Sequence, residues 1–278
     1  MMRNVFKYVF ILATISAFSQ SPWTQKKGEY YTQLSFTSIS GYNSLYDDPD
    51  YNTEREISDR TLQFFAEYGL SDKTSLLINI PFKMIKTGEL TSSELNTQTI
   101  NNSENTLGNI ELSIKHNFYK KDWVLSGQLS MEANTSSFDK ASGIRTGYNA
   151  WSFSPLILAG RGFGKTYVQA FIGANIRTNN YSSNFRIGGE VGRKLGKRIW
   201  LIGFLDIASS FKNGEILLPA ENLLTGLYVN DQEFSAFGFK AIGEISDNFG
   251  INASFGGAFS GNNVAKKAAL SAGIYHKF

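Results

Sequence analysis

The two histidines, His116 and His276, are the only imidazole groups in the 278-residue chain, so general-base catalysis and metal binding by nitrogen depend on where they point. Each shares its side of an alternating apolar and polar stretch with apolar residues, near a predicted strand end. The pattern predicts that both histidines lie on an outer apolar face. The chain has no cysteine, which excludes thiolate metal sites and disulfides. We therefore expect no catalytic residue, no metal site and no cofactor, and chemistry by carboxylates or tyrosines is the alternative that stays open.

A glycine-rich segment at residues 159–166 resembles the relaxed phosphate-loop pattern, since it reads Ala-Gly-Arg-Gly-Phe-Gly-Lys-Thr. A phosphate loop needs a helix after it, because the amino end of that helix holds the phosphates. Residues 167–174 alternate as a strand instead, so the segment is predicted to be a hairpin turn. A net charge of +3 is too small to indicate a nucleic-acid partner.

Carboxylates cluster in residues 46–56, where Asp47, Asp48 and Asp50 precede Glu54 and Glu56. Ca²⁺ binds about six to eight oxygen ligands, so such a cluster is a candidate calcium site. The spacing of a calcium-binding helix–loop–helix motif is absent, however, and no glycine turn is followed by a closing glutamate. These residues are predicted to form a solvated acidic loop.

The elements that position these groups are read from the periodicity of the chain. Apolar and polar residues alternate with a period of two in twelve segments. Crossing a bilayer takes about 10 residues of tilted strand, and each segment has at least this length. The predicted strands are residues 28–40, 58–70, 74–86, 107–119, 123–134, 148–161, 166–177, 183–195, 199–212, 233–245, 250–260 and 265–278.

The two faces of these strands differ in charge. One face is apolar and uncharged in mid-strand, as in Leu76, Ile78 and Ile80. A Lys or Arg side chain facing lipid in mid-bilayer costs about 2–4 kcal/mol, whereas one facing a wet lumen costs little. A soluble sandwich would also alternate, with its apolar face turned to a core. We favour a barrel and predict that its lumen is lined by Glu67, Lys83, Glu111, Lys115, Glu132, Arg177, Arg186, Glu190, Asp206, Lys240 and Glu244.

The start of the chain resembles a secretory signal peptide. Arg3 and Lys7 flank the start of an apolar run at residues 5–15, and small residues follow at 16–19. The run is shorter than the roughly 20 residues of a membrane-spanning helix. We predict a signal peptide at 1–19 and one barrel domain at 20–278. Connections after even-numbered strands are short and the others are often long, which is typical of outer-membrane barrels and predicts periplasmic termini.

The connection at residues 213–232 is too apolar to be freely solvated. Pro219 is predicted to open a short helix that has Glu221 in its first turn. Burial against neighbouring loops and contact with an apolar ligand both explain the composition, and both stay open. The candidate residues for a constriction of the barrel mouth or for ligand contact are Leu217, Leu218, Leu223, Leu224 and Tyr228.

Parts of the chain resemble known outer-membrane barrels. Phe278 shares a side with Ile274 and Leu270, and this ending is similar to the strand that the barrel-assembly machinery reads. Residues 23–28 (Trp-Thr-Gln-x-x-Gly) and 107–115 (Leu-Gly-Asn-x-x-Leu-x-x-Lys) resemble the barrel group named for the metA pathway of phenol degradation, whose usual Asp is Asn109 here. This resemblance implies an outer-membrane barrel that passes small, apolar compounds.

Together these features predict an all-β, antiparallel up-and-down barrel of about 12 strands in the outer membrane of a Gram-negative bacterium. The barrel would be surrounded by lipid, and its leading function would be that of a porin-like passive channel or facilitator for a small solute. One alternative is a structural or surface-interaction barrel with a lumen closed by ion pairs. Another is a lipid-modifying enzyme, although outer-membrane phospholipase, which has a similar strand count, relies on a Ser-His-Asn set that has no counterpart here.

Overall fold

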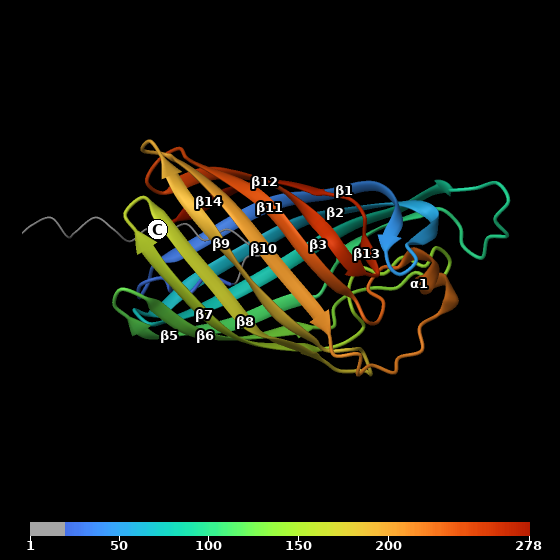
Figure 1. Ribbon diagram of the computed structural model, residues 1–278, viewed down its shortest axis with the longest axis horizontal. Coiled ribbons are helices and arrows are strands. Elements are labelled where there is room, and N and C mark those ends of the chain that lie inside the picture. Colours follow the sequence, from blue (N-terminus) through green and yellow to red (C-terminus); the bar gives the residue numbers. More distant parts are fainter. Residues whose placement is uncertain (1–19) are drawn as a thin grey trace, which may run out of the picture.

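The computed structural model describes residues 20–278, so the predicted signal peptide lies outside the described residues and stays a prediction. Strands make up most of the described chain (Figure 1). The twelve long strands are β1 (Tyr30–Tyr46), β2 (Tyr51–Ser71), β3 (Thr74–Leu90), β5 (Ile110–Lys120), β6 (Val124–Ala133), β7 (Ser152–Phe163), β8 (Thr166–Arg177), β9 (Asn184–Leu195), β10 (Ile199–Ser210), β11 (Glu233–Glu244), β12 (Phe249–Asn262) and β14 (Ala269–Lys277). The short elements are β4 (Asn102–Leu107), β13 (Val264–Ala265) and the helix α1 (Ala220–Thr225).

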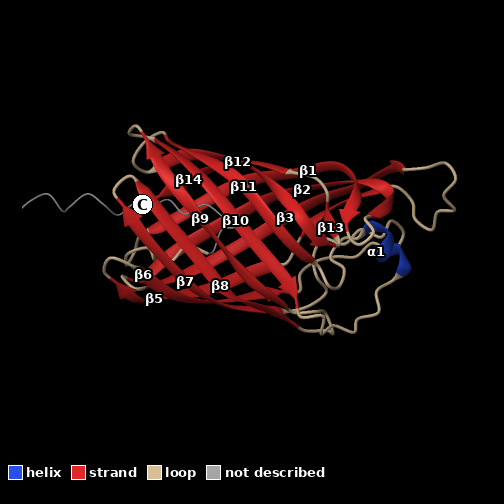
Figure 2. Cartoon of the chain, in the orientation of Figure 1, coloured by secondary structure: helices blue, strands red, loops and turns tan. Residues whose placement is uncertain are grey.

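The sheet closes on itself. Neighbouring long strands pair antiparallel in chain order, and β1 pairs with β2 on one side and with β14 on the other. The amide of Tyr30 donates to the carbonyl of Phe278 and the amide of Phe278 donates to that of Tyr30, each at 2.9 Å. Figure 2 shows a tilted cylinder of strands with α1 at one end. This confirms the predicted closed antiparallel barrel and the pairing of its last strand with its first.

The two ends of the barrel differ. At one end, called here the termini end, β1 begins, β14 finishes and the turns between strands are short. At the other, the loop end, lie residues 91–101, 134–151 and 211–232, together with α1 (Figure 1). Within residues 20–278 no helix has both the length and the apolar character needed to cross a bilayer.

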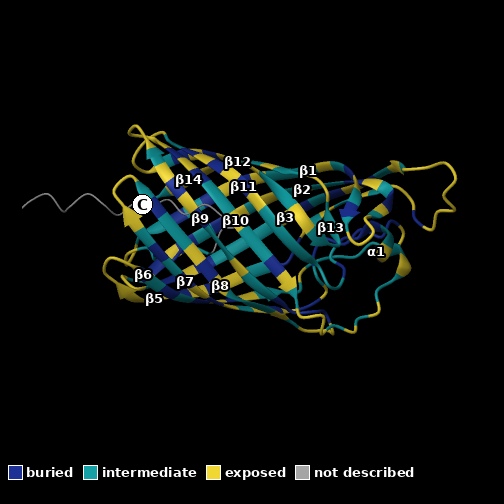
Figure 3. Cartoon of the chain, in the orientation of Figure 1, coloured by how far each residue is buried: buried dark blue, intermediate teal, exposed yellow. Residues whose placement is uncertain are grey.

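Buried and exposed residues alternate along the strands, as Figure 3 shows. In β8, Ile172 is 44% exposed on the outside, whereas its neighbour Phe171 is 6% exposed on the inside. The outer face carries aliphatic and aromatic side chains on every long strand, which is the parity that the sequence predicts.

The first long loop is shorter than predicted. Residues 41–46 and 51–57 extend β1 and β2 beyond the barrel wall, and only residues 47–50 form the turn. Asp47, Asp48 and Asp50 occupy this turn, but Glu54 lies in β2 and is buried, so the prediction of a single solvated acidic loop is wrong for Glu54. Register shifts after Ile39 break the period of two, and for this reason the alternation was lost there.

The predicted strand at residues 107–119 is divided. β4 pairs with β3 toward the loop end and β5 pairs with β3 toward the termini end, with Gly108 and Asn109 between them opposite Pro81. Pro81 has no amide hydrogen to continue the ladder, and its carbonyl accepts from Gly108 at 2.9 Å. Residues 159–166 form the β7–β8 hairpin, which confirms the prediction of a turn in place of a phosphate loop.

Candidate functional site: the barrel interior

All eleven charged residues that the sequence predicts to face inward lie on the inner face, and none is exposed. They pair mostly between strands. Lys115 Nζ lies 3.0 Å from Glu67 Oε1 and donates to Oε2 at 3.2 Å, and both side chains are 1% exposed. Water does not reach this pair, so the charges depend on one another for stabilisation.

A second buried pair lies across three strands. Glu190 accepts from Lys240 Nζ at 2.6 Å through Oε2 and from the Tyr167 hydroxyl at 2.6 Å through Oε1. Arg186 pairs with Asp206 at 2.9 Å and is partly exposed to the interior. Glu67, Asp206 and Glu190 therefore each have a basic partner, which balances their charges locally along the wall.

The remaining predicted residues have other partners. Lys83 lies 2.7 Å from Asp59, and Glu244 lies 2.6 Å from Lys194. Sequence reasoning missed Asp59 and Lys194 because each lies at the edge of a predicted strand, although each has the inward parity. Polar contacts complete the set: Glu132 accepts from Asn109 at 2.9 Å, Glu111 accepts from Ser113 at 2.9 Å, and Arg177 donates to the Ser182 carbonyl at 2.9 Å.

The segment before β1 fills the lumen at the termini end. Trp23 is 8% exposed and meets the Tyr167 ring edge-on at a centroid distance of 5.9 Å. The amide of Gln25 donates to Ser75 Oγ at 3.0 Å, and the Pro22 carbonyl accepts from Ser126. The sequence did not predict this position, because nothing in a short polar segment indicates that it folds into a lumen.

Ten apolar residues form a buried cluster at this end. Trp23 is the member that comes from the segment before β1, and the others come from the strand walls. The cluster closes the termini end with side chains that exclude water. Its members are Trp23, Tyr31, Phe65, Leu77, Val124, Tyr167, Trp200, Ile202, Ile242 and Tyr275.

Two inward glycines make room for the segment. A Cβ on Gly160 would lie 2.7 Å from Pro22 Cγ and 2.8 Å from Trp23 Cη2. A Cβ on Gly69 would lie 1.9 Å from the Lys26 carbonyl oxygen. Any larger residue at these positions would displace the segment, so the wall is shaped for it.

A second buried apolar cluster closes the loop end. It combines the extended β1–β2 hairpin and β3 with two loops, and its members are Tyr42, Leu45, Ile57, Ile85, Ile144 and Leu227. Arg145 Nε donates to Asn222 Oδ1 at 3.0 Å, and Thr225 Oγ1 donates to the Gly143 carbonyl at 3.0 Å. These bonds join the 134–151 loop to the 211–232 loop.

The 134–151 loop is itself ordered around Asp139. Its carboxylate accepts from the amides of Ala141 and Ser142 at 3.2 and 3.1 Å, from Asn102 at 2.9 Å and from the Ser142 hydroxyl. Desolvation alone would raise the pKa of Asp139, but these hydrogen bonds to the charged form outweigh it and lower the pKa below its ordinary value.

A polar chamber of about 370 Å³ lies between the two clusters. Its walls include Asp59, Lys83 and Glu132, and two tyrosines lie toward the loop end. The rings of Tyr148 and Tyr228 meet edge-on at 5.4 Å, and Lys83 Nζ lies 5.6 Å from the centre of the Tyr228 ring. The chamber offers charged, amide and phenolic groups to a small molecule.

The five candidate residues of the 211–232 loop lie in different places. Tyr228 reaches the chamber, whereas Leu223 and Leu224 line a different cavity on the outer side of the loop end. Leu218 is partly buried, and Leu217 is 96% exposed. Of the five, Tyr228 is therefore the residue placed at the chamber, while Leu223 and Leu224 face the other cavity, and a role of these residues in constriction or ligand contact stays a prediction. The helix itself begins at Ala220, after Pro219, close to the predicted start.

The histidines lie on the outer face near the termini end, as the sequence predicts. His116 Nδ1 lies 2.9 Å from Thr74 Oγ1, and the His276 ring lies 5.7 Å from that of Tyr30. In the described part of the chain, no group of three or more His, Asp or Glu side chains is arranged to hold a metal ion.

Solved outer-membrane barrels have the same architecture. An outer membrane channel from Pseudomonas putida F1 aligns with 92% of this chain and 97% of its own, with a TM-score of 0.68 and 14% identity. The translocator domain of autotransporter NalP from Neisseria meningitidis aligns with 91% of this chain and 90% of its own (TM-score 0.55, 10% identity). The KdgM porin aligns with 88% and 99% (TM-score 0.52, 6% identity). No protein-family model and no curated protein matches the sequence. At these identities the likeness concerns the fold.

Proposed function

We propose that this protein is a passive outer-membrane channel for small solutes, with its loop end facing the cell exterior and its termini end facing the periplasm. The observation that carries the proposal is the polar chamber of about 370 Å³ held between two apolar clusters. A chamber of this size, lined by charged groups and hydroxyls, can hold a small solute. The architecture shared with an outer membrane channel and a porin supports the same function.

The two apolar clusters act as closures in this proposal. At the termini end, the segment before β1 contributes Trp23 and is attached to the walls by a few hydrogen bonds, such as that from Gln25 to Ser75. Such a segment moves out of a lumen at lower cost than a wall strand, whose whole ladder of hydrogen bonds would break. Passage would follow the concentration gradient, because nothing in the barrel supplies energy.

The proposed solute is small and carries no large net charge. The interior pairs acidic with basic groups, so it gives no single-sign field to concentrate anions or cations. Chamber tyrosines such as Tyr148 and Tyr228 add apolar ring faces beside the charged groups. A compound with an apolar body and one or two polar groups fits these walls.

Replacing Trp23 with Ala tests this proposal in planar bilayers. We expect single-channel conductance to rise several-fold, because the variant loses the indole that fills the termini end. Lys27→Gln is the matched control, since the Lys27 side chain is exposed and only its backbone bonds to Asp72. Silence from both variants, in protein that migrates as a folded barrel on electrophoresis, would refute the channel.

A second candidate is a barrel with a permanently closed lumen that serves a structural or surface-interaction role. The burial of the Lys115 and Glu67 side chains, each 1% exposed, favours it. The same bilayer experiment separates the two candidates, because a closed barrel stays silent when Trp23 is removed. A lipid-modifying enzyme has no comparable support, since His116 contacts Thr74 and His276 contacts the Tyr30 ring.

The outer face of the barrel is the surface that we propose lipid covers. Exposed apolar side chains such as Ile172, Leu201 and Phe239 would contact lipid acyl chains, and this apolar outer face supports a position in the outer membrane. The last strand, β14, with Phe278 directly after it, would bind the barrel-assembly machinery before it pairs with β1. Crosslinking from this strand during assembly would detect that partner.

A further inference from the structure

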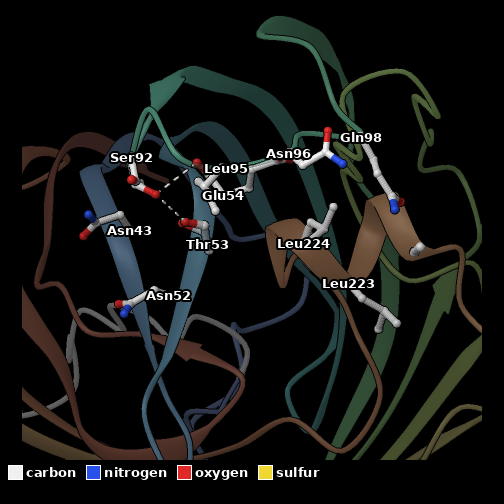
Figure 4. Close-up of a pocket in the computed structure, with 12 residues that line it drawn as sticks. Asn43, Asn52, Thr53, Glu54, Ser92, Leu95, Asn96, Gln98, Leu223 and Leu224 are labelled. Carbon is white, nitrogen blue, oxygen red and sulfur yellow. Dashed lines mark hydrogen bonds between the residues drawn. The ribbon is translucent and has the colours of Figure 1, made fainter.

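A cavity of about 720 Å³ lies at the loop end, outside the barrel interior. It is bounded by the extended β1–β2 hairpin, the segment at residues 91–98 and helix α1 (Figure 4). Its volume is within the range of about 300–1,000 Å³ that is usual for small-molecule sites. The channel proposed above does not use it, because the polar chamber has a different set of lining residues.

Four side-chain amides line this cavity. Asn43 and Asn52 come from the β1–β2 hairpin, and Asn96 and Gln98 come from the 91–98 segment (Figure 4). Thr91 in the same segment fixes it to β2, because its hydroxyl donates to the carbonyls of Thr53 and Glu54 at 3.1 Å. None of the four amides hydrogen-bonds to another group in residues 20–278. Each offers a donor pair and an acceptor, which is the complement of a hydroxyl group.

The remaining walls are aliphatic. Leu95 lies in the 91–98 segment, and Leu223 and Leu224 project from α1 (Figure 4). Leu223 is 50% exposed, so part of its apolar surface is available to a ligand. Figure 4 shows the α1 leucines on one side of the cavity and the hairpin side chains Asn43, Asn52 and Thr53 on the other. A ligand with a polar part and an apolar part would therefore satisfy both sides.

The charge of the lining excludes an anion. Glu54 is the only ionisable side chain among the lining residues, and it is 7% exposed. Its Oε2 accepts from the Thr99 hydroxyl. A carboxylate or phosphate ligand would approach this buried negative charge without a Lys, Arg or His side chain in the lining to offset it. An uncharged ligand meets no such cost.

We propose that this cavity binds an uncharged amphiphile whose headgroup carries hydroxyls, as in an alkyl glycoside. The hydroxyls bond to the amides of Asn43, Asn52, Asn96 and Gln98, and a short alkyl chain packs on the leucines of α1. Binding at this site requires no conduction. The inference therefore goes beyond the proposed channel and stands or falls separately from it.

Saturation-transfer NMR with the full barrel in lipid nanodiscs tests the site, with hexyl β-D-glucoside as the probe. We expect saturable binding that weakens roughly five- to tenfold in Leu223→Asn, because half-exposed leucine surface is lost. Leu217→Asn is the matched control: it lies on the same loop, is 96% exposed and does not line the cavity, so its affinity should equal that of the wild type. Equal weakening in both variants, or in neither, overturns the site.

The headgroup is tested with hexanoate, whose six-carbon chain ends in a carboxylate and therefore carries a negative charge in place of the sugar. We expect hexanoate to bind at least tenfold more weakly than hexyl glucoside. Asn52→Ala should weaken the glucoside about fivefold, in line with the loss of one hydrogen bond, and leave hexanoate unchanged. Hexanoate that binds as tightly as the glucoside would overturn the proposal. Bilayer conductance of Leu223→Asn should match the wild type, which separates this result from the channel.

Discussion

Replacing Lys115 with Met should destabilise the barrel strongly, because it leaves Glu67 buried without its partner. The ammonium nitrogen lies 3.0 and 3.2 Å from the two carboxylate oxygens, and both side chains are 1% exposed. At 3 Å and an effective dielectric constant of about 20, the attraction between two unit charges is about 5.5 kcal/mol. Desolvation offsets much of it, and breaking a buried pair from one side typically costs about 3–5 kcal/mol. We expect a loss in that range.

Urea unfolding in detergent micelles, followed by tryptophan fluorescence, measures this loss. Lys194→Met is the matched control, since Lys194 pairs with Glu244 at 2.6 Å but is 25% exposed, and we expect it to cost about 1 kcal/mol or less. Adding Glu67→Gln to Lys115→Met should recover most of the stability, because no uncompensated charge remains. A cost below about 1 kcal/mol for Lys115→Met alone would show that water reaches the pair, and would refute the sealed interior.

Three further changes test the parity, the segment before β1 and the loop end. Ile172→Arg should destabilise the assembled barrel by about 2–4 kcal/mol, since Ile172 is 44% exposed on the outer face. Gln169→Arg, on the inner face, should assemble normally, and electrophoresis of the folded barrel compares the two variants. Equal tolerance of both changes would contradict the assignment of the outer and inner faces. Gly160→Leu should displace the segment before β1, because even a Cβ at this position would lie 2.8 Å from Trp23. A red shift of the tryptophan emission would show that Trp23 has moved into water. The pKa of Asp139 is lower in the folded loop than in the unfolded chain, where it is about 3.9, so ionised Asp139 stabilises the fold above that pH. This stabilisation should be lost as the pH falls through the pKa of the folded state. An NMR titration of the amides of the 134–151 loop should show the loss in the wild type but not in Asp139→Asn.

The barrel could be predicted from the sequence because its signal is local. The alternation in β3 or β8 depends only on which side of the strand a residue occupies, and a charge on the lipid side is costly enough to leave a clear pattern. The inward placement of Lys115 and Glu67 followed from this parity. Their pairing did not follow from it. Glu67 lies on β2 and Lys115 on β5, on either side of β3, and the sequence does not show how close side chains on these two strands come.

Features that depend on tertiary contacts were not predictable. The position of Trp23 in the lumen depends on the space left by Gly160, and neither residue indicates the other in sequence. The 211–232 loop was recognised as too apolar for free solvation, but the direction of its leucines depends on how α1 packs beside the β1–β2 hairpin. The extension of that hairpin was hidden by the register shifts after Ile39.

In the proposed channel the segment before β1 closes a conducting barrel, and a reversible crosslink of this segment to the wall is a direct test of that closure. The amide of Gln25 lies 3.0 Å from Ser75 Oγ, which brings the two residues side by side, so cysteines are introduced at these two positions of a chain that contains no other cysteine. Single-channel recordings of the Gln25→Cys, Ser75→Cys variant should be silent when oxidised and should conduct when a reductant is added. Conductance that is the same in both states, or absent from both, would show that the segment does not close a conducting barrel.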